Sequence, residues 1–222
     1  MIIVSRLVCL AIGYFLGLFQ TGFIYGKTQG IDIRTQGSGN AGTTNCLRVL
    51  GTKAAAITFF GDSIKAILAI VIVRILFGTL LAGTMHVDSI KLLELYAGLG
   101  AVIGHNYPFY MGFRGGKGIA STFGVMLALC PSIALVCVVV FIIIFAITHY
   151  VSLGSVVIVT VFLAGVVIAN HMMLLGVSPE YLVEFDIVAA CFTLMAIWRH
   201  RANIKRLLNH EESKVYLFKK KN

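Results

Sequence analysis

Residues 132–149 read SIALVCVVVFIIIFAITH, a stretch without a charged side chain. A helix needs about 20 apolar residues to cross the hydrocarbon of a bilayer, and this stretch is close to that length. Comparable apolar runs lie at about 3–25, 54–81, 92–110, 153–174 and 182–198. A shorter run at about 118–130 lies between a glycine-rich segment and Pro131. The sequence therefore predicts an all-α integral membrane protein with about seven transmembrane helices, one of them short.

The composition also indicates a bilayer rather than water as the surroundings. Hydrophobic residues make up 59% of the 222 residues, charged residues 12%, and the mean hydropathy is +0.94. A soluble domain has about 45–50% apolar and about 25% charged residues. A soluble enzyme, a disordered segment and a secreted disulfide scaffold are excluded, and the five cysteines are expected to be small buried hydrophobes. We predict a single membrane domain over 1–222 that ends in a basic tail at 199–222.

The basic residues predict the orientation. The net charge is +9, and most of the 18 Lys and Arg residues lie in three segments: 26–53, 111–117 and the tail from 199. With seven spans these segments fall on one side, which the positive-inside rule identifies as the cytoplasm. We therefore predict an outside N-terminus and a cytoplasmic C-terminus. The closing Lys219, Lys220 and Lys221 are expected to contact anionic lipid rather than nucleic acid.

The first polar segment is rich in glycine: residues 37–48 read GSGNAGTTNCLR. It contains GxGxxG, but a dinucleotide fingerprint follows a strand, whereas an apolar span precedes this segment. Successive glycines free backbone N–H groups to bind an anion, and the Ser, Asn and Thr side chains add donors. The guanidinium of Arg48 suits phosphate or carboxylate. The alternative is a flexible turn between helices.

A second and a third polar segment show related features. Residues 112–118 read GFRGGKG, which lacks the phosphate-loop spacing but places Lys117 between glycines at the start of an apolar helix. Residues 199–206 read RHRANIKR, and in a helix His200 and Asn203 would share a face. The alternatives are an interfacial lysine in a flexible loop, and a basic membrane anchor with a buried histidine.

Two features lie inside the predicted spans. Asp62 and Lys65 stand three residues apart, which predicts a mutual ion pair, with a proton or ion pathway as the alternative. Glycines at positions 13, 17, 22 and 26 predict close helix packing. The six histidines show no HxxxH or HExxH spacing, so no metal site is predicted.

The order of four segments is more specific than any one of them. GSGNAGTTNCLRVLG, GHNYPFYMGFRGGKG, YVSLGS and HRANIKRLL, separated by apolar runs, closely resemble the acyl-phosphate:glycerol-3-phosphate acyltransferases of bacteria, the PlsY family. The resemblance covers about 13–214. It implies an enzyme that transfers a fatty acyl group from acyl-phosphate to the 1-hydroxyl of glycerol 3-phosphate, making lysophosphatidic acid in the first step of phospholipid synthesis.

The same resemblance implies the setting of the enzyme. Such proteins lie in the bacterial inner membrane as multi-pass proteins, with their motif loops facing the cytoplasm. They need no cofactor, neither metal nor coenzyme A, and their partners are the two substrates and membrane lipid, with no nucleic acid; a monomer is expected. The alternative from another class is a polytopic transporter of a small phosphorylated or anionic substrate, because broken apolar runs also mark transport pathways.

The resemblance further implies residue roles. The catalytic residues are expected to be Ser38, Arg48, Lys117, His200 and Asn203. The substrate-binding residues are expected to be Gly37, Gly39, Asn40, Thr44, Asn45, Gly115, Gly116 and a serine at Ser152 or Ser155. The chain departs from the family pattern at Ala41, Gly61, Ala66 and Ala202. At position 202 the usual residue is Glu, so a carboxylate that could hold His200 or an arginine is lost.

Overall fold

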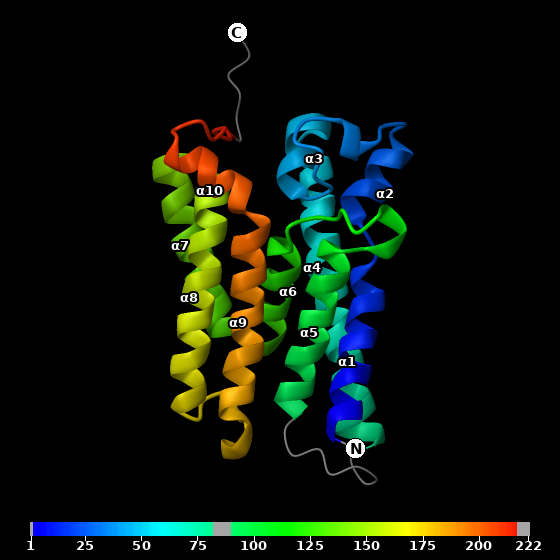
Figure 1. The fold of residues 1–222 in the computed structure, drawn as a ribbon, viewed down its shortest axis with the longest axis vertical. Helices are drawn as coiled ribbons and strands as arrows, with labels where there is room; N and C mark the ends of the chain where they lie inside the picture. Colours follow the sequence, from blue (N-terminus) through cyan, green and yellow to red (C-terminus); the bar gives the residue numbers. More distant parts are fainter. Residues whose placement is uncertain (1, 82–89, 217–222) are drawn as a thin grey trace.

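Apolar helices pack side by side into one bundle (Figure 1). The computed structural model describes residues 2–81 and 90–216, so the lipid contact predicted for Lys219 to Lys221 lies outside the described residues. The bundle consists of α1 (Ile2–Gly17), α2 (Thr21–Thr28), α4 (Thr52–Ile75, continued by a π-helical turn at Leu76–Leu80), α5 (Ile90–Asn106), α6 (Ile119–Leu129), α7 (Pro131–Thr148), α8 (Val151–His171) and α9 (Leu182–Arg199). Short elements lie in the connections between them: η1 (Ile33–Thr35), α3 (Thr43–Leu50), η3 (Phe109–Met111) and η4 (Pro179–Tyr181). A last short helix, α10 (Arg201–Leu208), follows α9.

The predicted class, an all-helical membrane protein, is confirmed. Within the described ranges, five helical segments are long and apolar enough to cross a membrane: Ile3–Thr28, Thr52–Leu80, Pro131–Thr148, Val151–His171 and Pro179–Arg199. The shorter α5 (17 residues) and α6 (11 residues) pack within the same bundle. The predicted total of seven spans stays a prediction.

The helix ends differ from the apolar runs in two places. The run 92–110 does not form one helix to its end, because α5 stops at Asn106. Pro108 follows closely, and the residue before a proline is disfavoured in a helix. The run 3–25 is a single apolar segment but two helices, since α1 ends at Gly17 and α2 begins at Thr21.

Glycines allow α1 to approach α5 closely, as the sequence predicts. A methyl group at Gly13 would lie 1.9 Å from the carbonyl oxygen of Ala97, and one at Gly17 would lie 2.2 Å from that of Ala101. On the facing helix, a methyl at Gly100 would lie 2.1 Å from the carbonyl oxygen of Leu10. Only small residues permit this contact between the two backbones.

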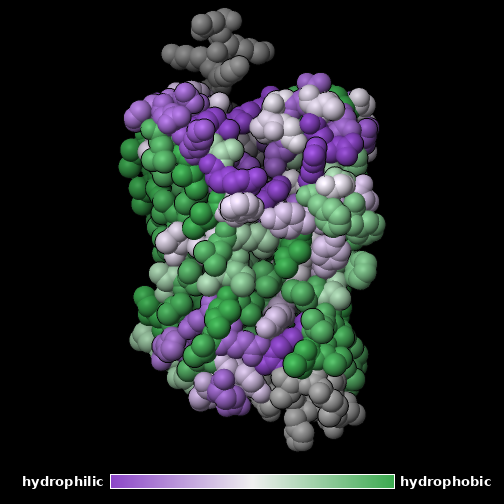
Figure 2. Space-filling view, in the orientation of Figure 1, coloured by the Kyte–Doolittle hydropathy of each residue, from purple (hydrophilic) through white to green (hydrophobic). Residues whose placement is uncertain are grey.

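The three polar motifs lie at one end of the bundle. Figure 1 shows α2, α3, the α5–α6 loop and α10 at that end, whereas α1 begins at the other. In Figure 2 hydrophilic residues gather around a hollow at the same end, a second hydrophilic patch lies toward the other end, and hydrophobic surface separates the two. The fold therefore brings together segments that the sequence separates by more than a hundred residues.

Candidate active site

The first glycine-rich loop is built around the buried side chain of Asn45. Its Oδ1 accepts from the N–H of Ser38 (2.8 Å), and its Nδ2 donates to the carbonyls of Ile33 (3.1 Å) and Gln36 (3.0 Å). Asn45 is 1% exposed, in the first turn of α3. It therefore holds the loop in shape from behind, and Ser38 is exposed in front of it.

The glycines are expected to free backbone N–H groups for an anion, but three of these N–H groups bind protein carbonyls instead. Gly39 donates to Gln36 (3.0 Å), while Gly115 and Gly116 donate to the carbonyls of Asn106 and His105 (3.1 Å each). That expectation is wrong for these three N–H groups, because protein carbonyls already occupy them. Gly37 and Gly39 instead adopt the left-handed backbone (φ 58° and 68°) that turns the loop.

The second loop returns along the end of α5 and leads into α6. Gly118 has φ 82° and precedes the first residue of α6, so Lys117 projects just ahead of that helix, as the sequence predicts. The guanidinium of Arg199 donates to the carbonyls of Gly115 (2.9 Å) and Gly116 (2.7 Å). From the sequence, a basic membrane anchor explains Arg199. In the structure its hydrogen bonds hold this loop against α9.

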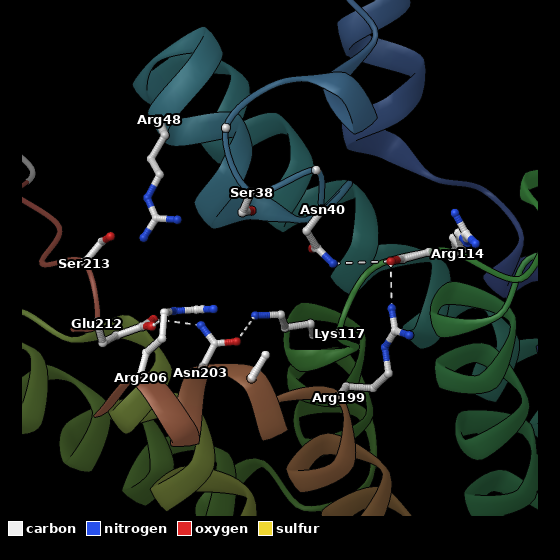
Figure 3. Close-up of a pocket in the computed structure, with 14 residues that line it drawn as sticks. Ser38, Asn40, Arg48, Arg114, Lys117, Arg199, Asn203, Arg206, Glu212 and Ser213 are labelled. Carbon is white, nitrogen blue, oxygen red and sulfur yellow. Dashed lines mark hydrogen bonds and ion pairs between the residues drawn. The ribbon is translucent and has the colours of Figure 1, made fainter. Parts of the chain in front are cut away.

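The loops enclose a cleft of about 610 Å³. It is lined by Gly37, Ser38, Gly39, Asn40, Arg48, Arg114, Gly115, Lys117, Arg199, Ala202, Asn203, Arg206, Glu212 and Ser213. Figure 3 shows Arg48 and Ser38 on one side, Asn203 and Glu212 on the opposite side, and Lys117 reaching between them. Asn40 bridges the first two loops by donating to the carbonyl of Gly115 (3.3 Å).

Positive charge dominates the lining. Lys and Arg provide five of the lining residues, and Glu212 is the carboxylate among them. Within the described part of the chain, the guanidinium groups of Arg48 and Arg114 have neither a hydrogen bond nor an ion pair. Lys117 Nζ donates to Asn203 Oδ1. A cleft with this surplus of cations suits a ligand with several negative charges.

Burial, together with the charges of Arg206, Arg199 and Arg48, lowers the pKa of Lys117 to about 8, although the charge of Glu212 acts in the opposite direction. Lys117 is therefore mostly protonated at neutral pH. Its hydrogen bond to Asn203 leaves further N–H groups, because an ammonium has three donors. It is positioned to bind a phosphate oxygen in the cleft.

Glu212 lies across the cleft from Arg48 and binds the polar side chains around it (Figure 3). Its carboxylate accepts from Ser152 Oγ (2.9 Å), Asn203 Nδ2 (2.7 Å) and Arg206 Nε (2.6 Å). Burial raises the pKa of Glu212, but these three hydrogen bonds outweigh burial and hold the pKa below its usual range. Glu212, a residue of the tail, thus holds Asn203 and Arg206 in place.

The structure distinguishes the two candidate serines. Ser152 contacts Glu212, whereas Ser155 donates to the carbonyl of Val151 in its own helix (2.8 Å). Neither lines the cleft.

His200 lies behind the cleft and is 3% exposed. The last span ends at Arg199 and α10 begins at Arg201, so His200 occupies the bend between two helices. Its Nδ1–H donates to the carbonyl of Ala196 (2.8 Å), which leaves Nε2 as the acceptor nitrogen. Burial, together with the charge of Lys117, lowers the pKa of His200 to about 4, so the ring is neutral at neutral pH.

The predicted site residues thus divide into two groups. The cleft is lined by Gly37, Ser38, Gly39, Asn40, Arg48, Gly115, Lys117 and Asn203. The others lie outside the lining: Thr44, Asn45, Gly116, Ser152, Ser155 and His200. Sequence reasoning did not assign Arg114, Arg199, Arg206, Glu212 or Ser213 to the site, because the arginines also fit the positive-inside rule and Glu212 lies in a polar tail without a motif.

The fold and the cleft together define a polytopic helical membrane protein with a cation-lined cleft that suits a ligand with several negative charges. The family described as glycerol-3-phosphate acyltransferase matches residues 7–210. A glycerol-3-phosphate acyltransferase of Clostridioides difficile (strain 630) is 44% identical over 219 residues, covering 96% of this chain and 97% of the relative. One of Bacillus subtilis (strain 168) is 40% identical over 214 residues, covering 96% and 98%.

Two solved structures are also similar to this chain. The crystal structure of PlsY (YgiH), an integral membrane glycerol 3-phosphate acyltransferase, in its glycerol 3-phosphate form is similar with a TM-score of 0.79 and 34% identity over 96% of both chains. Its lysophosphatidic acid form gives a TM-score of 0.76 over the same shares. This chain belongs to the glycerol-3-phosphate acyltransferase family.

Proposed function

We propose that this chain transfers a fatty acyl group from acyl-phosphate to the 1-hydroxyl of glycerol 3-phosphate, forming lysophosphatidic acid. The observation that carries the proposal is the surplus of cations in a cleft built from all three motif segments. Family membership supports the acyl transfer, and the relatives' printed names supply glycerol 3-phosphate as the acceptor.

The charge of the cleft fits two phosphate groups bound together. Each substrate carries a phosphate with a charge near −1.5 to −2 at neutral pH, by analogy with phosphoesters. Five cations against one carboxylate balance two such groups. Arg48 on one side and Lys117 in the middle are placed to hold the phosphates next to each other, which brings the glycerol hydroxyl close to the acyl carbon.

The chemistry places modest demands on the protein. The hydroxyl oxygen attacks the acyl carbon, the new ester bond forms, and the bond from that carbon to the phosphate oxygen breaks. The phosphate leaves and takes the hydroxyl proton, since phosphate oxygens have a second pKa near ~6 in related esters. Arg48, Lys117 and Ser38 stabilise the charge that develops on the transferred group and the leaving phosphate.

Neither a histidine base nor an acyl-serine intermediate is required. A catalytic base works best with a pKa near the operating pH, and that of His200 is about 4. Among the described residues, no histidine or carboxylate hydrogen-bonds the hydroxyl of Ser38, so nothing there activates it as a nucleophile. We assign His200 to positioning the α9–α10 bend, and through it Asn203 and Lys117.

The proposed setting is the bacterial inner membrane. Seven spans (α1 with α2, α4, α5, α6, α7, α8 and α9) would leave the N-terminus outside and the cleft facing the cytoplasm, where the basic segments belong by the positive-inside rule. The expected unit is a monomer, in contact with membrane lipid.

Accessible cysteines test this orientation. On a cysteine-free background, Lys53→Cys at the cleft end should react only from inside, and Glu180→Cys at the other end only from outside. Labelling of Lys53→Cys from outside in intact cells would reject the orientation.

The function is tested with purified protein in detergent, given acyl-phosphate and glycerol 3-phosphate. Lysophosphatidic acid should appear only when both substrates are present, and acyl-coenzyme A should not replace acyl-phosphate. Absence of product, together with uptake of glycerol 3-phosphate into protein-containing vesicles, would indicate a transporter instead.

A further inference from the structure

A buried polar cluster lies directly beneath the two loops of the cleft. It consists of Asp62 and Lys65 on α4, His105 on α5 and Thr21 on α2. The ion pair between Asp62 Oδ1 and Lys65 Nζ measures 2.8 Å, which confirms the predicted pair, and Lys65 Nζ lies 2.8 Å from His105 Nδ1. Asp62, Lys65 and His105 are 1%, 5% and 2% exposed. These three residues do not line the cleft.

The cluster fixes the break between α1 and α2. Lys65 Nζ donates to the carbonyl of Phe19, and Thr21 Oγ1 donates to Asp62 Oδ1 (3.1 Å). The ammonium thereby uses its three donors on Phe19, Asp62 and His105. The start of α2 is thereby tied to α4, and α2 leads into the loop that carries Ser38.

The same cluster fixes the second loop through His105. The carbonyl of His105 accepts from the N–H of Gly116 (3.1 Å) and from Nε2 of the buried Gln20 (2.9 Å). The ring also fills the space behind Gly116: a methyl at Gly116 would lie 1.9 Å from Nε2, and its next nearest atoms, at 2.7 and 2.9 Å, also belong to the ring. Lys117 is the next residue in the chain.

We propose that Asp62, Lys65 and His105 are positioning residues that hold Lys117 in register with the Ser38 loop. Resting on the proposed function, this assigns the charges inside the membrane a role in substrate binding rather than in a proton or ion pathway. The polar groups contact one another, the start of α2 and, through His105, Gly116 in the second loop, which links the two segments that lead to Ser38 and Lys117.

The first test removes both charges at once, in Asp62→Asn with Lys65→Met. Replacing a buried ion pair with neutral groups of similar volume often leaves stability unchanged. We expect the thermal unfolding midpoint to stay close to that of the wild type while KM for glycerol 3-phosphate rises by about fivefold or more. The matched control, Arg6→Met with Glu184→Gln, removes an ion pair at the other end of the bundle (2.5 Å) and should leave KM within about twofold.

The second test holds even if that double variant does not fold. Gly116→Ala should lower kcat/KM by about tenfold, because its methyl displaces the loop from the ring. His105→Ala opens space for the methyl, so the loss in the combined variant should be at least about threefold smaller than the product of the two single losses. If the two single losses in kcat/KM simply multiply in the combined variant, the contact between Gly116 and the His105 ring does not position Lys117, and the proposal is overturned.

A folded Asp62→Asn, Lys65→Met protein with the KM and kcat of the wild type would also overturn the proposal. Wild-type protein is assayed beside every variant for lysophosphatidic acid. An inactive wild type refutes the proposed function, whereas an active wild type with unaffected variants refutes only the positioning role.

Discussion

The two ends of the bundle carry charge in different ways. At the end where α1 begins, the Lys and Arg residues that the structure describes each lie next to a carboxylate: Arg6 with Glu184 (2.5 Å), and Arg74 (2.5 Å) and Lys91 (3.4 Å) with Glu94. In the lining of the cleft, five cations accompany a single carboxylate, Glu212, which forms an ion pair with Arg206. Both ends show hydrophilic surface in Figure 2, so hydropathy does not distinguish them.

The balance of charge does distinguish them. Paired ions satisfy one another and contribute modestly to stability. Unpaired cations held close together repel one another, which costs free energy. Binding of an anion offsets that cost. This difference supports the proposed binding of phosphates in the cleft and a structural role for the charges at the far end.

The largest expected effect comes from removing a cleft cation. Lys117→Ala and Arg48→Ala should each lower kcat/KM by about 10- to 150-fold, because a hydrogen bond to a charged group contributes about 1.5–3 kcal/mol. Steady-state kinetics with glycerol 3-phosphate varied would measure the loss. Near-normal kinetics in both variants would remove the phosphate-binding role from the cleft.

Raising the pH should have the next largest effect. The pKa of Lys117 is about 8, so the free enzyme keeps this charge below pH 8 and loses it above. We expect kcat/KM to fall about tenfold for each pH unit above that value. Lys117→Arg keeps its charge across the range and should flatten this limb of the profile. If the fall of kcat/KM at high pH is unchanged in Lys117→Arg, a group other than Lys117 causes it.

Loss of His200 should cost less than loss of a cation. His200→Ala removes a buried ring that holds the α9–α10 bend, and we expect kcat to fall by a few-fold, roughly two to five, at saturating substrates. No limb of the pH profile should disappear. If the variant binds both substrates normally but turns over at the background rate, His200 is the base and the proposed mechanism is wrong.

The smallest effect is expected at the far end. Lys91→Ala removes the same side chain as Lys117→Ala, but Glu94 keeps its ion pair with Arg74. Activity should stay within about twofold of the wild type. A tenfold loss of activity in Lys91→Ala, with the fold retained, would mean that charge at both ends serves the reaction.

The helices could be predicted from sequence because apolar length is a local property. The pattern at 118–130 anticipates α6 (Ile119–Leu129), and the basic segments anticipate that the motifs meet at one end. The Asp62–Lys65 pair could also be predicted because its partners are three residues apart.

Partners far apart in sequence could not be predicted. His105 joins the Asp62–Lys65 pair, and Glu212 reaches Ser152, only because helices pack in a particular register. The use of the Gly115 and Gly116 N–H groups by α5 carbonyls likewise depends on the path of the loop. Hydropathy and motif spacing carry no information about these contacts.

The central claim is that the surplus of cations holds two phosphate-bearing substrates at the same time. Initial rates of lysophosphatidic acid formation, with acyl-phosphate and glycerol 3-phosphate both varied, test it most directly. The account predicts double-reciprocal lines that intersect, as expected when both substrates must be bound before any product leaves. Parallel lines, together with acyl groups recovered covalently on the protein, would contradict it.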